Sequence, residues 1–557
     1  MAVPSKSIID TRHDQMFPNL EPSEVERVRR FGEVQSFGAG EALASVGTVG
    51  HGLSIVLSGD VDVTRHDRSG HAALIVTHGP GAFLGELAQL AGRPSLVDAR
   101  ARGPVQALII SPDRLRALLI AEAELGERIM RALILRRVGL LETGAGGPVI
   151  IGRAESGDVL RLENFLRRNG HPHQTLNAVT DPEAKALIER FHVDPAQLPI
   201  VLCPGGQLLR NPGEDELARC IGLVGPIDPD RIYDVVIIGA GPAGLAAAVY
   251  AGSEGLSALV LDCRAFGGQA GASARIENYL GFPTGISGIA LMARAYNQAQ
   301  KFGVEMAIPD EATSLQIPAD SGPFVLNLFN NERARARSVV IASGVRYRRL
   351  AVKNLEAFES TSVHYWASPL EAKLCTGQEV ALVGAGNSAG QAVVYLASQV
   401  AKVWLIVRGA DLNANMSSYL VDRIKGLSNV EVLTRTQITG LEGADGMLEA
   451  VRWRQGASGE EVRRPIRHVF LFIGADPNTD WLAESGIALD AKGFVLTGME
   501  AGGNRRLLET SRPGVFAIGD VRSGSVKRVA ASVGEGAQVV AALHGFLAAP
   551  DRNVLEK

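Results

Sequence analysis

Cysteine is scarce in this chain. Its 557 residues include four cysteines, Cys203, Cys220, Cys263 and Cys375, and no two of them form a C-x-x-C motif. Closely spaced cysteines are typical of a redox dithiol or a zinc site, and many regularly spaced ones are typical of a disulfide framework. The sequence therefore predicts neither a disulfide framework nor a metal site.

Long apolar runs and an excess of one charge are also absent. No stretch approaches the roughly 20 apolar residues of a membrane span, and the first residues lack the apolar core of a secretion signal. The formal net charge of −4 gives no basic surface for nucleic acid. We expect a cytoplasmic protein that binds neither membranes nor nucleic acid.

Glycine is abundant, and the chain is too long for one core, so we expect several domains. Residues from about 31 to 101 alternate apolar and polar positions with glycine at the turns, which predicts a β-roll. A helical pattern follows and ends at LETGAGGP, a linker-like segment. The next eighty residues alternate strand and helix patterns and predict one small α/β domain, which ends at GPIDPDR. From Tyr233 onward, two strand-loop-helix units predict two dinucleotide-binding domains. The predicted domains are 1–146, 147–228, 229–348 continued by 468–557, and 349–467.

The first glycine loop is G-x-G-x-x-G, formed by Gly239, Gly241 and Gly244 between an apolar strand and an alanine-rich helix. These glycines suit a tight turn, close approach of the backbone to a pyrophosphate, and close helix-strand packing. Asp262 ends the next strand, where an acid can accept hydrogen bonds from a ribose. The first unit is therefore predicted to bind a dinucleotide.

The second loop is a G-x-G-x-x-A variant that suits a nicotinamide dinucleotide. Its next strand ends in an arginine rather than an acid, and an arginine can pair with the 2′-phosphate that distinguishes NADPH from NADH. NADPH is therefore favoured over NADH. The candidate residues are Gly384, Gly386, Asn387, Ser388, Ala389 and Arg408.

Together with GGQ, IENYLGFP, IASG and GVFAIGD, the first loop resembles the flavin-binding half of low-molecular-weight thioredoxin reductases, from about residue 232 to 545. The resemblance implies two Rossmann-like domains of three-layer ββα type, FAD, hydride transfer from NADPH, and a homodimer. It implies that Asp520 holds the ribityl chain of FAD. For Asn278 and Arg528, an exposed loop contact stays open as an alternative. The other residues that it places at FAD are Gly268, Gln269, Ser343, Gly344, Gly519, Val529 and Ala530.

In those reductases a C-x-x-C pair lies just before the second loop, and alignment without gaps puts Ala367 and Leu370 at its two positions. Disulfide exchange needs an attacking thiolate and a second sulfur, which alanine and leucine cannot supply. Cys375 is expected to be a small buried apolar residue. Electrons would then pass to an external acceptor: a thioredoxin-like or ferredoxin-like protein, another disulfide, a quinone or dioxygen.

The middle segment resembles a thioredoxin or glutaredoxin fold around LPIVLC, with Pro199 as the proline, commonly cis, before a central strand. Ser156 and Asp158 occupy the helix start that would normally carry the redox pair. We expect Cys203 and Cys220 to be buried structural thiols, and the domain to be structural or to dock a substrate.

GAFLGELAQLAGRPSLVDARA resembles the phosphate-binding cassette of cyclic nucleotide-binding domains, with Gly85 and Glu86 at the ribose and phosphate segment. Ser95 replaces the arginine that usually pairs with the phosphate, which weakens the expected binding. Compensation by Arg93 and loss of binding both stay open.

The leading hypothesis is an FAD-dependent NADPH oxidoreductase of the thioredoxin reductase-like class, without an internal dithiol. One alternative is a ferredoxin or flavodoxin NADP reductase. Another is a cyclic-nucleotide or redox sensor with little turnover.

Overall fold

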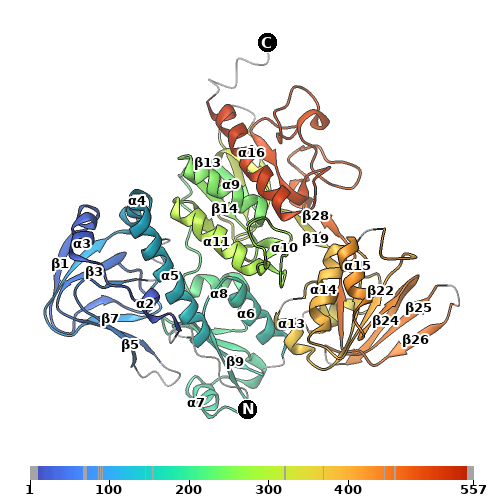
Figure 1. Ribbon diagram of the computed structural model, residues 1–557, viewed down its shortest axis with the longest axis horizontal. Coiled ribbons are helices and arrows are strands. Elements are labelled where there is room, and N and C mark those ends of the chain that lie inside the picture. The colour runs from blue at the N-terminus through green and yellow to red at the C-terminus, as the bar shows by residue number, and fades with distance from the viewer. Residues whose placement is uncertain are drawn as a thin grey trace.

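The computed structural model describes residues 11–548, apart from residues 67–71, 86, 88, 89, 91, 145, 154, 155, 319–321, 360, 368, 415, 445, 457 and 458. Figure 1 shows a blue front unit, a teal middle unit, and two larger units that we call the first and second dinucleotide units. None of the described helices combines the length and the apolar character that a membrane crossing requires.

The front unit, residues 13–143, is a β-roll of two antiparallel sheets, as the alternating pattern predicted. The facing sides of the sheets carry apolar residues such as Val56, Val61 and Leu84, which are buried. The α-helices α2 to α5 cover the described part of the roll, and the longest of them, α5, runs between the front and middle units (Figure 1). One sheet contains β1 (Glu33–Phe37), β8 (Val105–Ile110), β3 (Leu53–Ser58) and β6 (Phe83–Leu84); the other contains β2 (Ala42–Ala44), β7 (Asp98–Ala101), β4 (Val61–His66) and β5 (Ala72–His78). The helices are α2 (His13–Met16), α3 (Pro22–Val28), α4 (Pro112–Ala121) and α5 (Ala123–Thr143).

The middle unit, residues 149–220, is a four-stranded mixed sheet in the order β10-β9-β11-β12. β9 pairs parallel with β10 and antiparallel with β11. The Leu198–Pro199 peptide bond before β11 is cis, in agreement with the expectation for Pro199. The strands are β9 (Val149–Gly152), β10 (Gln174–Asn177), β11 (Ile200–Leu202) and β12 (Leu208–Arg210), and the helices are α6 (Gly157–Arg168), α7 (Pro182–Arg190) and α8 (Glu214–Cys220).

Cys203 and Cys220 form a disulfide, so the expectation of two separate thiols, and of no disulfide, is wrong. Cys203 follows β11 and Cys220 ends α8, and the fold brings their Cα atoms to 6.3 Å. The 17 residues from Cys203 to Cys220 contain a turn, the strand β12 and the helix α8, so the pairing depends on tertiary packing that the sequence pattern does not reveal.

The first dinucleotide unit is built on a largely parallel sheet in the order β15-β14-β13-β18-β17-β16, with β29 paired to β18. Helices α9, α11 and α16 pack on one face, around an alanine-rich core. The other face shares one continuous core with α6 and α8 of the middle unit, through residues such as Phe165, Leu217 and Val236. Its elements are β13 (Ile232–Ile238), α9 (Pro242–Ser253), β14 (Ala258–Leu261), α10 (Gly268–Gly271), α11 (Gly288–Lys301), β15 (Glu305–Ala307), β16 (Ala312–Gln316), β17 (Phe324–Leu328), β18 (Arg333–Ile341), β29 (Val515–Ala517) and α16 (Val529–Leu547).

The second dinucleotide unit has a five-stranded parallel sheet in the order β20-β27-β21-β22-β23 and a three-stranded antiparallel sheet, β24-β25-β26. A short ribbon of β19 (Val345–Tyr347) and β28 (Ala475–Pro477) joins the two dinucleotide units. The other elements are α12 (Leu355–Phe358), β20 (Val363–His364), α13 (Pro369–Leu374), β21 (Glu379–Val383), α14 (Asn387–Ala397), β22 (Lys402–Ile406), α15 (Ser418–Lys425), β23 (Val430–Leu433), β24 (Thr436–Ala444), β25 (Met447–Gln455), β26 (Glu461–Arg464) and β27 (His468–Leu471).

Candidate functional site

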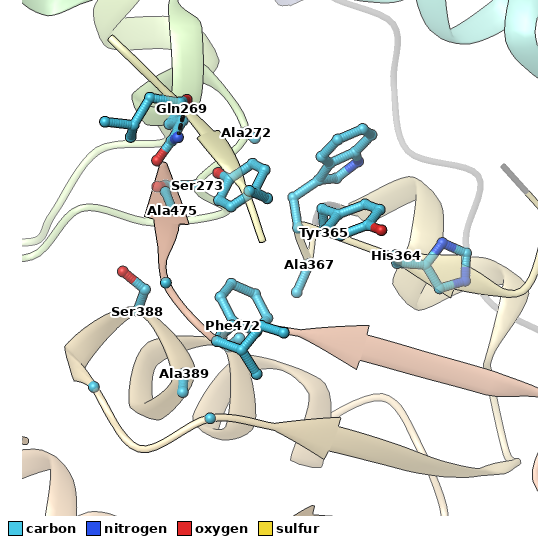
Figure 2. A pocket seen from close by; sticks show the side chains of 18 of the residues that line it. Gln269, Ala272, Ser273, His364, Tyr365, Ala367, Ser388, Ala389, Phe472 and Ala475 are labelled. Atoms are coloured by element: carbon cyan, nitrogen blue, oxygen red, sulfur yellow. Dashed lines mark hydrogen bonds between the residues drawn. The ribbon is translucent and has the colours of Figure 1, made fainter. Parts of the chain in front are cut away.

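A cavity of about 2220 Å³ lies between the two dinucleotide units, and both predicted glycine loops line it. Figure 2 shows part of its wall, with Gln269 on one side and Ala367, Ala389 and Phe472 on the other. Helix α6 of the middle unit also lines this cavity, so three units meet there.

The first glycine loop has the backbone geometry that a dinucleotide loop needs. Gly239 has a φ of 111°, and a Cβ there would overlap the carbonyl oxygen of Ala342. A Cβ on Gly244 would overlap the carbonyl oxygen of Gly239, because α9 packs directly against the turn. Gly241 precedes the first residue of α9, where backbone N–H groups are free to bind an anion. The strand, turn and helix therefore follow the sequence prediction.

Asp262 is positioned by the same loop. One carboxylate oxygen accepts from the backbone N–H of Ala240 at 2.8 Å, and the other accepts from that of Arg264 at 3.1 Å. Burial raises the pKa of Asp262, and these backbone hydrogen bonds oppose the rise. The residue lines the cavity and keeps lone pairs for a further donor.

Gln269 is held by a hydrogen bond from its Nε2 to the carbonyl oxygen of Val345 at 2.6 Å. Ser343 donates from its hydroxyl to the carbonyl oxygen of Asn478 at 2.8 Å. Burial raises the pKa of Asp520. Of the residues predicted to contact FAD, Gly244 lies beneath its loop and Ala530 is exposed outside the cavity lining. The others all line the cavity: Gly239, Gly241, Asp262, Gly268, Gln269, Asn278, Ser343, Gly344, Gly519, Asp520, Arg528 and Val529.

The second loop also has the predicted geometry. Gly384 has a φ of 151°, and a Cβ there would lie 2.5 Å from the carbonyl oxygen of Phe472. Arg408 follows β22 and is exposed, and no hydrogen bond or ion pair joins it to another described residue. All six predicted residues line the cavity: Gly384, Gly386, Asn387, Ser388, Ala389 and Arg408.

Of the two positions that align with the C-x-x-C pair, Ala367 lines the cavity and is 6% exposed. Leu370 belongs to α13, and its side chain lies outside the described residues. Cys375 is fully buried in the core beside α14, and burial raises its pKa to about 12, which confirms the expected buried cysteine. Cys263 lines the cavity next to Asp262, without a second cysteine among the described lining residues.

Several lining residues were missed because they come from another domain or from aromatic positions without a motif. The guanidinium of Arg168, on α6, lies 5.1 Å from the ring centre of Trp366. Trp366 in turn donates from Nε1 to Glu371 at 2.9 Å. Tyr347 and Tyr365 stack with ring centres 6.0 Å apart. The basic pair in LRRNG is the one sequence signal for Arg168, and it is common on helix surfaces.

The fold also groups His364, Cys375 and His468, although the sequence spacing predicted no metal-ligand cluster. Their ligand-type atoms lie within 4.8 Å of one another, and all three residues are buried. The two imidazoles share a hydrogen bond of 3.1 Å, and burial lowers the pKa of His364 to about 3 and that of His468 to about 4. A pair of neutral, mutually bonded histidines accounts for this cluster without an ion.

The front unit contains a separate cavity of about 240 Å³, lined by Gly85 and Ser95 among others. Glu86 lies outside the described residues. The Ser95 hydroxyl donates to the carbonyl oxygen of Val97 at 2.8 Å. Arg93 does not line this cavity, so compensation by Arg93 is wrong: its Nη2 donates to the Tyr296 hydroxyl of the first dinucleotide unit at 2.7 Å.

Comparisons with known proteins agree with this geometry. Residues 233–536 match the family described as pyridine nucleotide-disulphide oxidoreductase, and residues 34–122 match the cyclic nucleotide-binding domain. The chain is 33% identical to the thioredoxin reductase of Mycolicibacterium smegmatis over 311 residues, which cover 55% of this chain and 93% of that protein. It is 31% identical to a component of the alkyl hydroperoxide reductase of Pseudomonas putida, over 56% of this chain and 58% of that protein.

Among solved structures, the thioredoxin reductase of T. acidophilum superimposes with a TM-score of 0.53 at 29% identity, covering 57% of this chain and all of that one. Thioredoxin reductases use FAD and NADPH. The family match spans both glycine loops and the cleft between them. The chain therefore belongs to the pyridine nucleotide-disulphide oxidoreductase family and is an FAD-dependent oxidoreductase.

Proposed function

We propose that this enzyme moves electrons from NADPH through FAD to an external acceptor, without a dithiol of its own beside the flavin. The observation that carries the proposal is the cleft wall at Ala367, the position at which the resemblance to thioredoxin reductases implies the first cysteine of a C-x-x-C pair. Among the described residues, the two cysteines outside the disulfide lie apart, one buried behind the wall and one beside Asp262.

The first dinucleotide unit fits FAD for two reasons. Its loop leaves no room for a Cβ at Gly239 or Gly244, and hydrogen-bond donors and acceptors of the chain line one cavity. Backbone N–H groups at the start of α9 would hold the pyrophosphate, and Asp262 would accept from the adenosine ribose. Asp520 would hold the ribityl chain, and Gln269, fixed by Val345, would face the ring system. When bound, FAD supplies the centre that takes a hydride from NADPH and releases electrons to the acceptor.

The second unit fits a nicotinamide dinucleotide through Gly384, Gly386 and the N-terminus of α14. Arg408 is exposed at the cavity and can pair with the 2′-phosphate of NADPH.

Among acceptors, a disulfide on a small partner protein is best supported, because the relatives are a thioredoxin reductase and a component of an alkyl hydroperoxide reductase. The partner disulfide would take two electrons and two protons and become two thiols. No mixed disulfide with this chain would form at the cleft wall, since Ala367 offers no sulfur.

We also propose that the middle unit, within residues 147–228, has a thioredoxin-like fold with a structural or docking role. Its mixed sheet and the cis Pro199 support this assignment. The same proposal includes a homodimer. It also includes the division of the chain into the domains 1–146, 147–228, 229–348 with 468–557, and 349–467.

An anaerobic titration with NADPH tests the proposal. The oxidised-flavin absorbance should bleach after one hydride equivalent per FAD, in the native protein and in Cys375→Ser alike. Uptake of a second equivalent that disappears in Cys375→Ser or Cys263→Ser would reveal an internal disulfide that contains that cysteine and accepts electrons, and would contradict it.

A panel of acceptors then identifies the partner class. NADPH oxidation should be fastest with a thioredoxin-like disulfide protein, compared with ferredoxin-type, quinone and oxygen acceptors. Turnover confined to a ferredoxin or flavodoxin would favour the alternative reductase instead.

A further inference from the structure

The cavity of the front unit lies between the β-roll and α5, and its wall is mostly apolar. The apolar residues that line it include Leu43, Val63, Leu74, Ile75, Val76 and Leu140. Its volume of 240 Å³ equals that of about eight liquid water molecules, so it suits a small ligand of roughly ten non-hydrogen atoms.

Two charged side chains line this cavity: Arg65 of β4, which is partly exposed, and Arg136 of α5, which is only 8% exposed. The Nε of Arg136 donates to the carbonyl oxygen of Met16 at 2.9 Å, and its Nη1 donates to that of Gly85 at 2.8 Å. Its guanidinium lies 4.6 Å from the ring centre of Phe83 and 5.3 Å from that of Phe17. These four contacts fix the guanidinium at the cavity wall.

In the part of the chain that the structure describes, no carboxylate pairs with the charge of Arg136. No ion pair joins it to a described carboxylate, and its buried Nη2 has no hydrogen-bond partner in the described part of the chain. Burial lowers its pKa to about 9, so it stays protonated at neutral pH. The aromatic faces offset part of the cost of burying this charge, but an unpaired donor at a cavity remains unfavourable.

The neighbouring polar groups do not supply the missing anion. His78 is buried beside the cavity, and burial together with Arg136 lowers its pKa to about 3, so it is neutral. Ser95 is 3% exposed and already donates to Val97. Arg65 is partly open to solvent, so among the described lining residues the buried charge without a balancing anion is that of Arg136.

We propose that the front cavity binds a compact organic monoanion with an apolar body, a monocarboxylate of medium chain length or with one aromatic ring, and that Arg136 is its counter-ion. The carboxylate would meet the guanidinium, and the body would fill the space between the sheets and α5. Arg136 lies outside the segment that matches the cyclic nucleotide-binding domain, residues 34–122.

A cyclic nucleotide fits this wall less well. The cassette position that should hold a phosphate-binding arginine is Ser95, and Arg93 points to Tyr296 instead. Most of the lining is apolar, and polar groups of a ribose and a purine that lose water there without new hydrogen bonds weaken binding.

Calorimetric titration of the full-length holoenzyme tests the proposal with octanoate and phenylacetate, and with octanamide as the uncharged analogue. Octanoate should bind at least about tenfold more tightly than octanamide, because the amide cannot form the charge-assisted contact. In Arg136→Gln the two ligands should bind alike. Arg131→Gln, on the exposed side of α5 where Arg131 pairs with Glu127, should leave the preference unchanged.

The comparison of octanoate with octanamide on the native protein needs no variant, and Arg136→Lys keeps the charge if Arg136→Gln does not fold. Absence of binding by both carboxylates, equal binding of octanoate and octanamide, or an unchanged preference in Arg136→Gln would overturn the proposal. Tighter binding of cyclic AMP or cyclic GMP than of either carboxylate would overturn it as well.

Discussion

At the scale of single residues, motif positions were predictable and partners from distant segments were not. The first two glycines of each loop and Arg408 stand at fixed distances from strand and helix patterns, so their place at the cavity followed from the sequence. Arg93 shows the limit: its place in the cassette suggested a phosphate contact, but the packing of the front unit turns it toward Tyr296.

Arg408 provides a prediction about cosubstrate choice. Arg408→Ala should lower kcat/KM for NADPH by roughly tenfold and leave that for NADH nearly unchanged, because the charge-assisted contact to the 2′-phosphate is lost. Steady-state kinetics with both donors measures this. Arg454→Ala, an exposed arginine of β25 outside the cavity lining, is the control and should change neither. Equal losses for the two donors would assign Arg408 a different role.

At the scale of elements, local patterns predicted the strand-loop-helix units and the β-roll well. The reason is that a glycine loop and its flanking apolar strand lie within about 20 residues, where local conformation decides the structure. The disulfide and the group of His364, Cys375 and His468 could not be predicted, because each joins elements that only tertiary packing brings together.

Gly244 tests the packing of α9 against its loop. Gly244→Ala should lower the free energy of unfolding by about 1–3 kcal/mol and weaken FAD retention, since the new Cβ overlaps the carbonyl oxygen of Gly239. Thermal unfolding and the FAD-to-protein absorbance ratio report the two effects. Gly534→Ala in α16, where a Cβ meets nothing within 4 Å, should be neutral or stabilise by up to about 1 kcal/mol. Full FAD content in Gly244→Ala would contradict the packing argument.

The Cys203–Cys220 disulfide joins the end of β11 to the end of α8. A closed loop of 17 residues restricts the unfolded chain, so the disulfide should stabilise the protein by about 3 kcal/mol. Reduction with a phosphine should therefore lower the melting temperature of the native protein and leave that of the Cys203→Ala, Cys220→Ala double variant unchanged. An unchanged melting temperature after complete reduction, verified by thiol counting, would show that the disulfide contributes little.

At the scale of the whole molecule, the four units share cores and contacts that no single sequence motif predicts. The middle unit packs on the first dinucleotide unit through one continuous core and reaches the second through Arg168 and Trp366. The order of the units along the chain was predictable, but these contacts were not, because they join surfaces whose sequence patterns are those of ordinary amphipathic helices.

Buried histidines in three units should make stability depend on pH. Burial lowers the pKa of His78, His171 and His364 to about 3 and that of His468 to about 4, below the unfolded value near 6.5. Between these values the unfolded chain binds more protons than the folded one, so stability falls as the pH drops below about 6.5, by up to about 1.4 kcal/mol per pH unit for each histidine.

Urea unfolding at pH 7.5, 6.5 and 5.5 measures this dependence. His171→Asn should lose about 1 kcal/mol less than the native protein between pH 6.5 and 5.5, because one titrating group is gone. His192→Asn is the control, since His192 lies outside the core and its positive φ suits asparagine. Identical pH profiles for the native protein and His171→Asn would contradict the assignment.

Helix α5 directs two consecutive arginines to contacts in two different units. Arg136 lies at the front cavity, whereas the Nε of Arg137 donates to the carbonyl oxygen of Gly170, just beyond α6, at 3.0 Å. Adjacent residues project about 100° apart around a helix, so any axial turn or slide of α5 moves both side chains together. A ligand bound at Arg136 would therefore also bear on the contact between Arg137 and Gly170, which couples the front cavity mechanically to the end of α6.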